Sequence, residues 1–345
     1  MPAEWEPHEA TWIAWPHERS DWPGRFDGVR WTYTEIVRRL GESERVEILV
    51  QDSAHERSAR RTLRAGNVDL TAVRFWSIPT DRSWLRDSGP TFVRRTRAPF
   101  DLLGLQWKFN AWAKYDNWRA DRQVSPAICR AARTPSERAR IGSRWLVLEG
   151  GAFDVDGHGL LVATEECLLD RTQGRNPGLD RRAVERALRA NLGVEDVLWL
   201  PKGIAGDDTH GHVDDIARFV APGRLVVVRP ADRADIDRSA SDAAFDALAD
   251  VRPHAGRRLR LDPLPAPEPV LVRGQRLPAS YANFYIANRT VLVPTFDDPA
   301  DSAAIAILAG AFPGRRVVGI RSRDLVWGLG TLHCLTQQQP IAHAP

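Results

Sequence analysis

A cysteine near the C-terminal end of the chain has the surroundings of a nucleophile. Cys334 follows Gly328 and Gly330 and precedes the polar run 336–340. Glycines let the backbone adopt conformations closed to other residues and let a ligand approach closely. A thiolate is a strong, soft nucleophile that suits attack on an electron-poor carbon. A lone cysteine is more often a small core residue, so the interpretation depends on partners elsewhere in the chain.

Three other segments contain a histidine and acids that could serve this nucleophile. The run 206–215 contains His210 and His212 among four acidic residues, Asp87 lies three residues after Trp84, and Glu149 precedes two glycines. A histidine with an ordinary pKa of about 6.5 can protonate a departing ammonia and then deprotonate a water. Each segment also has a plain structural interpretation: a solvated turn, a helix start and a bulged strand end. Together they contain a nucleophile, a general acid/base and several acids.

Several carboxylates in one pocket predict a cationic ligand. They repel each other, and burial raises their pKa values unless a cation lies between them. A planar guanidinium suits paired acids, because each carboxylate can accept two parallel N–H bonds worth roughly 1.5 to 3 kcal/mol each. Its central carbon is electrophilic, so Cys334 could add to it, and the bound cation would lower the pKa of the thiol.

A divalent metal is the alternative cation. His210, His212 and Asp214 form an H-x-H-x-D run, but alternate residues share a face only on an extended strand. No other histidine belongs to a motif near an acid. We therefore expect no metal and no cofactor.

Composition favours a cytoplasmic enzyme made of one domain over residues 1–345. The hydrophobic content of 43% supports a full core, and no linker divides the chain. A net charge of +3 without a Lys/Arg block disfavours nucleic acid as a partner. No export signal or apolar run of about 20 residues is present, so no membrane partner is expected, whereas homo-oligomerisation stays open. Cys129, Cys167 and Cys334 form no C-x-x-C pair, which indicates reduced thiols.

Turn signals recur at a fixed period. Asp156-Gly157, Pro222-Gly223 and Asn288-Arg289 are hairpin-like turns whose first residues are 66 apart. Each is flanked by strand-like runs and followed by a helical stretch, at 180–191, 239–251 and 301–312, and then by another short strand. An earlier copy turning at Thr96-Arg97 and a partial copy over 46–75 give about five units. The proline-rich stretch 261–269 is expected to be a surface loop.

Equal periods predict similar packing units. Mixed α/β units of this size can close around an axis. Asp87, Glu149 and Asp214 lie nine, seven and eight residues before their turns. Equivalent placement would bring all three acids to the same end of the axis.

These motifs resemble those of the agmatine deiminase and Porphyromonas-type peptidylarginine deiminase family. The matching segments, in order, are MPAEWEPHEATWIAWP (1–16), WLRDSGPTF (84–92), LEGG (148–151), GDDTHGHVDD (206–215), SYANFYIAN (280–288) and LHCLTQQQP (332–340). The resemblance implies a five-bladed α/β propeller of pseudo-symmetric ββαβ units around a central active site. It also implies hydrolysis of a guanidino group to a ureido group with loss of ammonia, which for agmatine gives N-carbamoylputrescine.

The resemblance further implies roles for matched residues and a small cationic guanidino substrate as partner. Cys334 would form a covalent thiouronium intermediate and His212 would be the acid/base. Asp87 and Asp214 would clamp the guanidinium with support from Glu149. Trp84 would line the pocket.

The central segment departs from the family pattern, which commonly reads DETNGHVD. Asp208 is one methylene shorter than the family's acid, which is associated with the distal amine of the substrate, and His210 replaces an amide. Leu329 stands in a stretch usually richer in glycine and would narrow the approach to the thiol. Arginine, peptidylarginine or an alkylguanidine therefore remain alternative substrates. Amidine transfer and non-catalytic guanidine or polyamine binding are the alternative functions.

Other candidate residues are expected to be structural. His333 adjoins the nucleophile, but neighbours on an extended chain point to opposite faces. Cys129 and Cys167 are expected to be inert core thiols.

Overall fold

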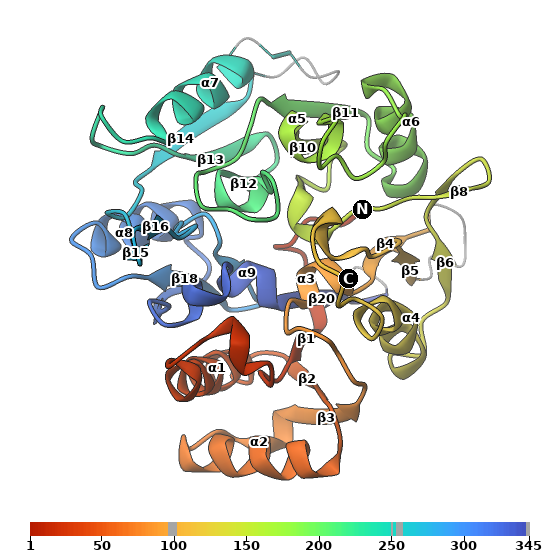
Figure 1. The fold of residues 1–345 in the computed structure, drawn as a ribbon, viewed down its shortest axis with the longest axis vertical. Coiled ribbons are helices and arrows are strands. Elements are labelled where there is room, and N and C mark those ends of the chain that lie inside the picture. Colours follow the sequence, from red (N-terminus) through yellow and green to blue (C-terminus); the bar gives the residue numbers. More distant parts are fainter. Residues whose placement is uncertain (96–101, 250, 253–257, 343–345) are drawn as a thin grey trace.

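The computed structural model describes all residues except 96–101, 250, 253–257 and 343–345. Helices and strands alternate along the chain, so the fold is a mixed α/β fold. In Figure 1 the long helices lie at the periphery, whereas the short helices α3 (Leu85–Ser88) and α9 (Leu332–Leu335) lie near the middle. Among the described residues, no helix is long and apolar enough to cross a membrane.

Five sheets of three or four strands share one pattern. In each, two antiparallel strands are followed by a parallel third strand. Their strands, in sheet order, are β20 (Thr336–Pro340), β1 (His8–Ala14), β2 (Arg45–Val50) and β3 (Val73–Ser77); β4 (Thr91–Arg94), β5 (Leu102–Gln106) and β6 (Ser136–Arg138); β9 (Phe153–Val155), β10 (Leu160–Thr164) and β11 (Asp196–Leu200); β12 (Ala217–Ala221), β13 (Arg224–Val228) and β14 (Arg260–Leu264); and β17 (Tyr285–Ile286), β18 (Thr290–Thr295) and β19 (Arg316–Arg321). Two small hairpins, β7 (Arg140–Ile141) with β8 (Arg144–Trp145) and β15 (Leu271–Val272) with β16 (Gln275–Arg276), complete the sheets of the described chain.

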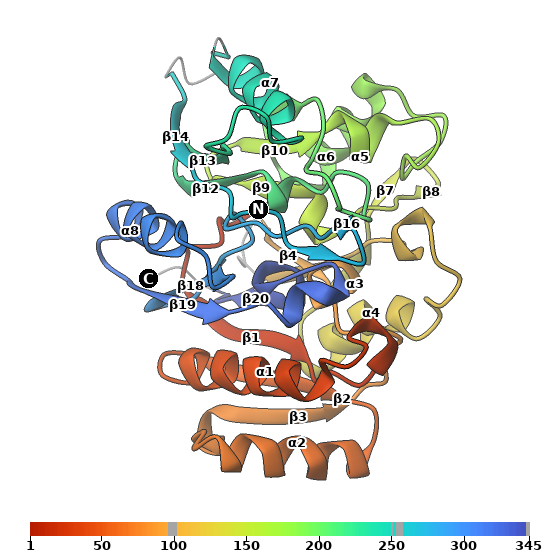
Figure 2. The ribbon, with the colours of Figure 1, turned by 60° about the vertical axis from the view of Figure 1, so that its left-hand side comes forward.

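The longer helices connect the parallel strands. They are α1 (Phe26–Leu40), α2 (Ser53–Ala65), α4 (Asp121–Ala131), α6 (Arg181–Leu192), α7 (Arg238–Ala249) and α8 (Asp301–Ala311). Figure 2 shows α1 and α2 next to β2 and β3, and both helices contact β2 and each other. The last strand, β20, pairs with the first, β1, so the two ends of the chain close one sheet.

Local signals explain why these helices form where they do. In α6 the side chain of Asp180 caps the N-terminus by accepting from the backbone N–H of Ala183, and Gly193 ends the helix with φ +69°. Val184, Ala187 and other residues at helical spacing are buried. The predicted helices at 180–191, 239–251 and 301–312 are confirmed as α6, α7 and α8.

The predicted turns are confirmed where the structure describes them, with two differences in the strands. The Thr96-Arg97 turn lies outside the described residues. The strand before Asn288 covers only Tyr285–Ile286. The expectation that 261–269 is entirely loop is wrong, because β14 includes Pro263. This strand pairs only with β13 within its sheet, and an edge strand tolerates a proline.

Candidate active site

Four short segments from different parts of the chain meet at the centre. Asp87 lies on α3, Glu149 precedes the 3-10 helix η4 (Gly150–Ala152), and His212 precedes η5 (Val213–Asp215), which contains Asp214. Cys334 lies on α9. The segment α3 contacts both α9 and η4, and η4 contacts η5. The predicted nucleophile, histidine and three acids are therefore gathered in one place.

The thiol of Cys334 faces a buried carboxylate. Its Sγ lies 3.7 Å from Oδ2 of Asp214, and the side-chain amide of Asn283 donates to Sγ at 3.1 Å. Burial, together with the negative charges of Asp214, Asp215 and Asp87, raises the pKa of the Cys334 thiol well above its ordinary value. The free site therefore holds a protonated thiol. A bound cation would oppose these charges and favour the thiolate.

His212 lies between two acids. Its Nδ1 is 3.9 Å from Oδ2 of Asp87 and its Nε2 is 3.7 Å from Oε2 of Glu149. Burial alone would lower the pKa of His212, but the charge of Asp87 and the contacts with Cys167 and Glu149 raise it well above its ordinary value. His212 is therefore an imidazolium at neutral pH, ready to donate a proton to a leaving group.

Asp87 is oriented by two donors. The indole Nε1 of Trp112 donates to Oδ2 at 2.8 Å, and the backbone N–H of Gly151 donates to Oδ1 at 3.0 Å. Burial raises the pKa of Asp87 to about 6, helped by the negative charges of Asp214 and Glu149 and opposed by His212. A bound cation would stabilise the ionised form of this carboxylate.

The carboxylate of Glu149 forms a buried ion pair with Arg175. The Nε of Arg175 donates to both carboxylate oxygens at 2.9 Å. Burial raises the pKa of Glu149, but the charge of Arg175 and the contact with His212 outweigh burial and bring it to about 2. Glu149 is thus a permanent negative charge next to His212, which fits the predicted supporting role.

One cluster of possible metal ligands occurs in the part of the chain that the structure describes. It comprises Glu149, Cys167 and His212, whose donor atoms lie within 4.8 Å of one another. His210 and Asp214, from the H-x-H-x-D run, are not part of it. Both oxygens of Glu149 already accept from Arg175. A metal at this cluster would have to compete with a guanidinium for its only carboxylate.

A pocket leads to the thiol of Cys334. Its lining includes Trp84, Asp87 and Cys334, all at most 9% exposed. Arg82, Trp112, Tyr115, Asp208, Thr209, Gly328, Leu329 and Gly330 complete the lining. Leu329 has φ +67°, a conformation that favours glycine. Trp84 and Asp208 thus line the pocket as expected.

Charged groups at the outer end of the pocket are already paired. Asp208 accepts from the hydroxyl of Tyr115 and lies 3.5 Å from the Nζ of Lys114. Arg82 donates to Asp21 at 2.5 Å and stacks on the ring of Tyr115. Of these groups, Arg82 and Asp208 line the pocket, so the distal part of a ligand would meet one cation and one acid, each with its own partner.

Gly151 packs against His212 and Asp214 so closely that no side chain fits at this position. A Cβ at this position would lie 2.6 Å from Nδ1 of His212 and 3.1 Å from an oxygen of Asp214. We expect Gly151→Ala to displace both groups and to lower kcat about 100-fold, because small misplacements of catalytic groups are costly. Steady-state kinetics would measure this. Gly310→Ala on α8 is the matched control, because a Cβ added there has no heavy atom within 4 Å, and it should keep full activity. Equal kcat values for the two variants would contradict the close packing of Gly151 against His212 and Asp214.

Several site residues were not predicted from their own sequence context. Asn283 lies within the SYANFYIAN motif, but no role was assigned to it. Trp112 and Arg175 belong to no motif, and the ten tryptophans among the first 120 residues are as typical of a bulky core as of an aromatic pocket. Cys167 borders His212 and Glu149, so the expectation of a plain core thiol holds better for Cys129.

His333 and Cys334 do not point to opposite faces, as they would on an extended chain. Residues 332–335 are helical, and both side chains reach the same oxygen of Asp214, with Nδ1 of His333 at 2.6 Å from Oδ2.

Comparison with known proteins identifies the family of the chain. The model of the Porphyromonas-type peptidyl-arginine deiminase family matches residues 1–340. The chain belongs to this family. An agmatine deiminase of Pseudomonas aeruginosa is 37% identical over 99% of this chain and 95% of its own length. The structure of the agmatine deiminase of Enterococcus faecalis has a TM-score of 0.90 and 31% identity, covering 99% of this chain and 96% of its own.

A third relative adds a substrate complex to the family comparison. A structure of the agmatine deiminase of C. jejuni, described as a cysteine-to-serine form with substrate bound, has a TM-score of 0.86 and 26% identity. It covers 98% of this chain and 95% of its own. These two solved agmatine deiminases thus share the fold of this chain over nearly its whole length.

Proposed function

We propose that this protein is an agmatine deiminase, a hydrolase that converts agmatine and water to N-carbamoylputrescine and ammonia. The observation that carries the proposal is a thiol beside an acid with one free oxygen. Among the described residues, Oδ1 of Asp214 is buried without a hydrogen-bond partner, and Oδ2 lies 3.7 Å from the Cys334 sulfur. With Asp87 nearby, this arrangement suits a guanidinium. The names of the relatives support the same reaction.

The first half-reaction follows from the charges of the site. Asp87 and the free oxygen of Asp214 accept N–H bonds from the guanidinium, and the bound cation releases the thiol proton to solvent. The Cys334 thiolate forms a C–S bond to the central carbon, whose π electrons move onto nitrogen. The imidazolium of His212 protonates the leaving nitrogen, so the C–N bond breaks, ammonia departs and a thiouronium cation remains.

The second half-reaction returns the site to its initial state. Neutral His212 takes a proton from a water, and the hydroxide adds to the thiouronium carbon. Collapse of this adduct breaks the C–S bond and leaves a ureido product with Cys334 as the thiol. Atoms and charge balance without a cofactor. Ammonia release without an acceptor amine distinguishes this reaction from amidine transfer, and turnover distinguishes it from guanidine sensing.

A second substrate class is favoured by the outer end of the pocket. Arg82 lines it, and Lys114 already neutralises Asp208. A substrate with a carboxylate on its tail, such as a guanidino acid or arginine, could pair with Arg82, and the charge of Lys114 would reduce its repulsion by Asp208. We rank this class after agmatine, since Asp208 lines the pocket and can attract an amine.

A matched substrate panel tests both possibilities. Ammonia and ureido product would be measured with agmatine, 4-guanidinobutyrate and arginine, for the natural protein and Arg82→Gln. We expect the highest kcat/KM with agmatine. If the natural protein prefers 4-guanidinobutyrate or arginine, and Arg82→Gln loses this preference while it keeps its activity on agmatine, the substrate belongs to the second class. If none of the guanidines gives product, the protein is not a deiminase.

The same proposal extends to the architecture and location. We propose that the five sheets are the blades of a five-bladed propeller within a single domain, which is supported by their common strand pattern. We also propose a cytoplasmic location, which is supported by three free cysteines.

A further inference from the structure

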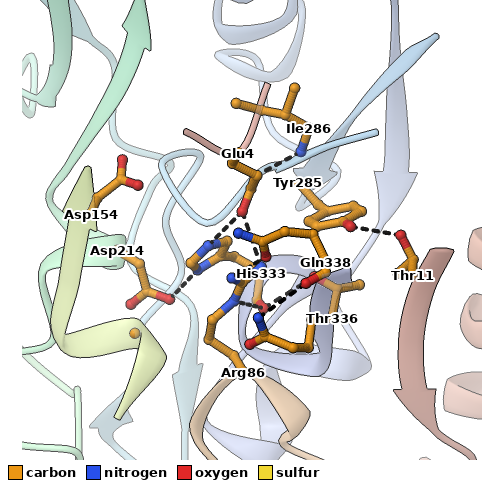
Figure 3. A network of polar contacts seen from close by, with 12 residues as sticks. Glu4, Thr11, Arg86, Asp154, Asp214, Tyr285, Ile286, His333, Thr336 and Gln338 are labelled. Atoms are coloured by element: carbon orange, nitrogen blue, oxygen red, sulfur yellow. Dashed lines mark hydrogen bonds and ion pairs between the residues drawn. The ribbon is translucent and has the colours of Figure 1, made fainter. Parts of the chain in front are cut away.

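Buried ionic contacts connect Asp214, the carboxylate next to the Cys334 thiol, to the N-terminal segment of the chain. His333 lies between two acids: its Nδ1 is 2.6 Å from Oδ2 of Asp214 and its Nε2 is 3.0 Å from Oε2 of Glu4. Glu4 comes from the N-terminal segment, 329 residues away in sequence. Figure 3 shows the imidazole of His333 between these two side chains.

Glu4 is enclosed by donors on every side. Its Oε1 accepts from Arg218 at 3.0 Å and from the backbone N–H of Ile286 at 2.8 Å, and its Oε2 also accepts from Arg86 at 3.0 Å. Burial alone would raise the pKa of Glu4, but the charges of Arg218, His333 and Arg86 hold it well below its ordinary value. Glu4 is therefore a fixed negative charge in the interior.

Both ring nitrogens of His333 face a carboxylate. A neutral imidazole has one N–H, so it would turn a lone pair toward one of the two carboxylates. With both nitrogens protonated, His333 donates to Glu4 and Asp214 at once. The buried network then contains three acids, Glu4, Asp154 and Asp214, against two guanidiniums and one imidazolium, and its formal charges cancel.

We propose that Glu4, acting through His333, is a positioning residue that keeps Asp214 ionised and turns its free oxygen toward the substrate; this inference rests on the proposed function. The Oδ2 of Asp214 is occupied by His333 and by Asn283 at 3.2 Å, whereas Oδ1 has no partner among the described residues. The N-terminal segment is thus part of the catalytic apparatus.

Other charges also act on these two side chains. The titratable and charged groups facing or acting on Asp214 are His333 and Cys334 from α9, His212 and Asp215 from its own segment, Asp87 from α3 and Arg218 from β12. Those acting on His333 are Glu4, Asp214, Asp154 and Arg86, whose Nε donates to the backbone carbonyl of His333 at 3.2 Å. His333 contributes most to lowering the pKa of Asp214, against the opposing effect of burial.

Glu4→Gln tests the proposal, because it keeps the side-chain shape and removes one charge. The charge next to Nε2 of His333 is then lost, so the contact of His333 with Asp214 weakens and the pKa of Asp214 rises. In the natural protein, log kcat/KM for agmatine should rise with pH by one proton across the neutral range, because the Cys334 thiol of the free site must lose its proton; below about pH 6, protonation of Asp87 should add a second proton. In Glu4→Gln we expect protonation of Asp214 to add a further proton on the acid side, so that the steeper part of the profile begins about half to one pH unit higher, with about a tenfold loss of kcat/KM near that point.

Asp154→Asn is the matched control. Asp154 contacts the same Arg218, through Nε at 3.0 Å, but does not contact His333 or Asp214 in the described contacts. Both variants should lower the melting temperature, because each breaks a buried ion pair. Glu4→Gln should change the pH profile clearly more than Asp154→Asn, because Glu4 contacts His333 directly and Asp154 acts on it only through its charge. An unchanged profile in Glu4→Gln, or an equal change in Asp154→Asn, would overturn the proposal.

A measurement on the natural protein decides the matter if Glu4→Gln does not fold. The ¹⁵N chemical shifts of the His333 ring should show two protonated nitrogens at neutral pH. A bare ring nitrogen would overturn the inference. Failure of the proposed function would look different, since the natural protein would then release no ammonia from agmatine at any pH.

Discussion

Replacing Cys334 with alanine should lower ammonia release from agmatine by at least about 10⁴-fold, because no other group can form the covalent intermediate. The sulfur lies 3.7 Å from Asp214 and accepts from Asn283, so its loss removes the nucleophile without removing the acids that bind the cation. Agmatine should still bind, as measured by titration calorimetry. Mass spectrometry of the natural protein quenched during turnover should find an adduct on Cys334.

Cys129→Ala is the control for the loss of a thiol. Cys129 is also buried, but it packs against Gly104 away from the pocket lining, so this variant should keep its activity. Activity within tenfold of the natural protein in Cys334→Ala would rule out covalent catalysis at this position. Loss of agmatine binding in the same variant would show that the acids do not form the binding site independently.

Replacing His212 with glutamine should lower kcat by about 10² to 10⁴-fold, the usual contribution of a general acid/base. The histidine is protonated in the free site because Asp87, Cys167 and Glu149 raise its pKa well above its ordinary value, against the effect of burial. A raised pKa means that the proton donor is present below that pKa and is lost as the pH rises through it. The alkaline decline of kcat should therefore disappear in His212→Gln.

The control for this second prediction is an exposed histidine. His158→Gln changes a residue exposed at the surface and absent from the pocket lining, so rate and pH profile should stay as they are. If His212→Gln keeps more than a tenth of the natural kcat, or keeps the alkaline decline, another group must protonate the leaving ammonia.

Local sequence patterns predicted the repeated elements and the chemical groups of the site. Helix α6 follows from a capping aspartate, a terminal glycine and helical spacing of apolar residues, all within a few positions of one another. Cys334, His212 and the acids were recognisable because their residue types and short-range spacing are unusual. The period of 66 residues further predicted that distant acids would come together.

Long-range contacts decided the remaining features. Asp214 and Asn283 are 69 residues apart, and Glu4 and His333 are 329 apart. The pairing of β20 with β1 also joins the two ends of the chain. The residues next to either partner form no local pattern from which such a contact could be predicted.

The sequence by itself determined which groups are present and which elements carry them. Only the tertiary structure decided which oxygen of Asp214 stays free, that α9 is helical at His333, and which acids are neutralised. These properties depend on burial and on neighbouring charges, because a carboxylate in a low-dielectric interior responds to every ion within a few ångströms. The distances that set this response exist only once the chain has folded.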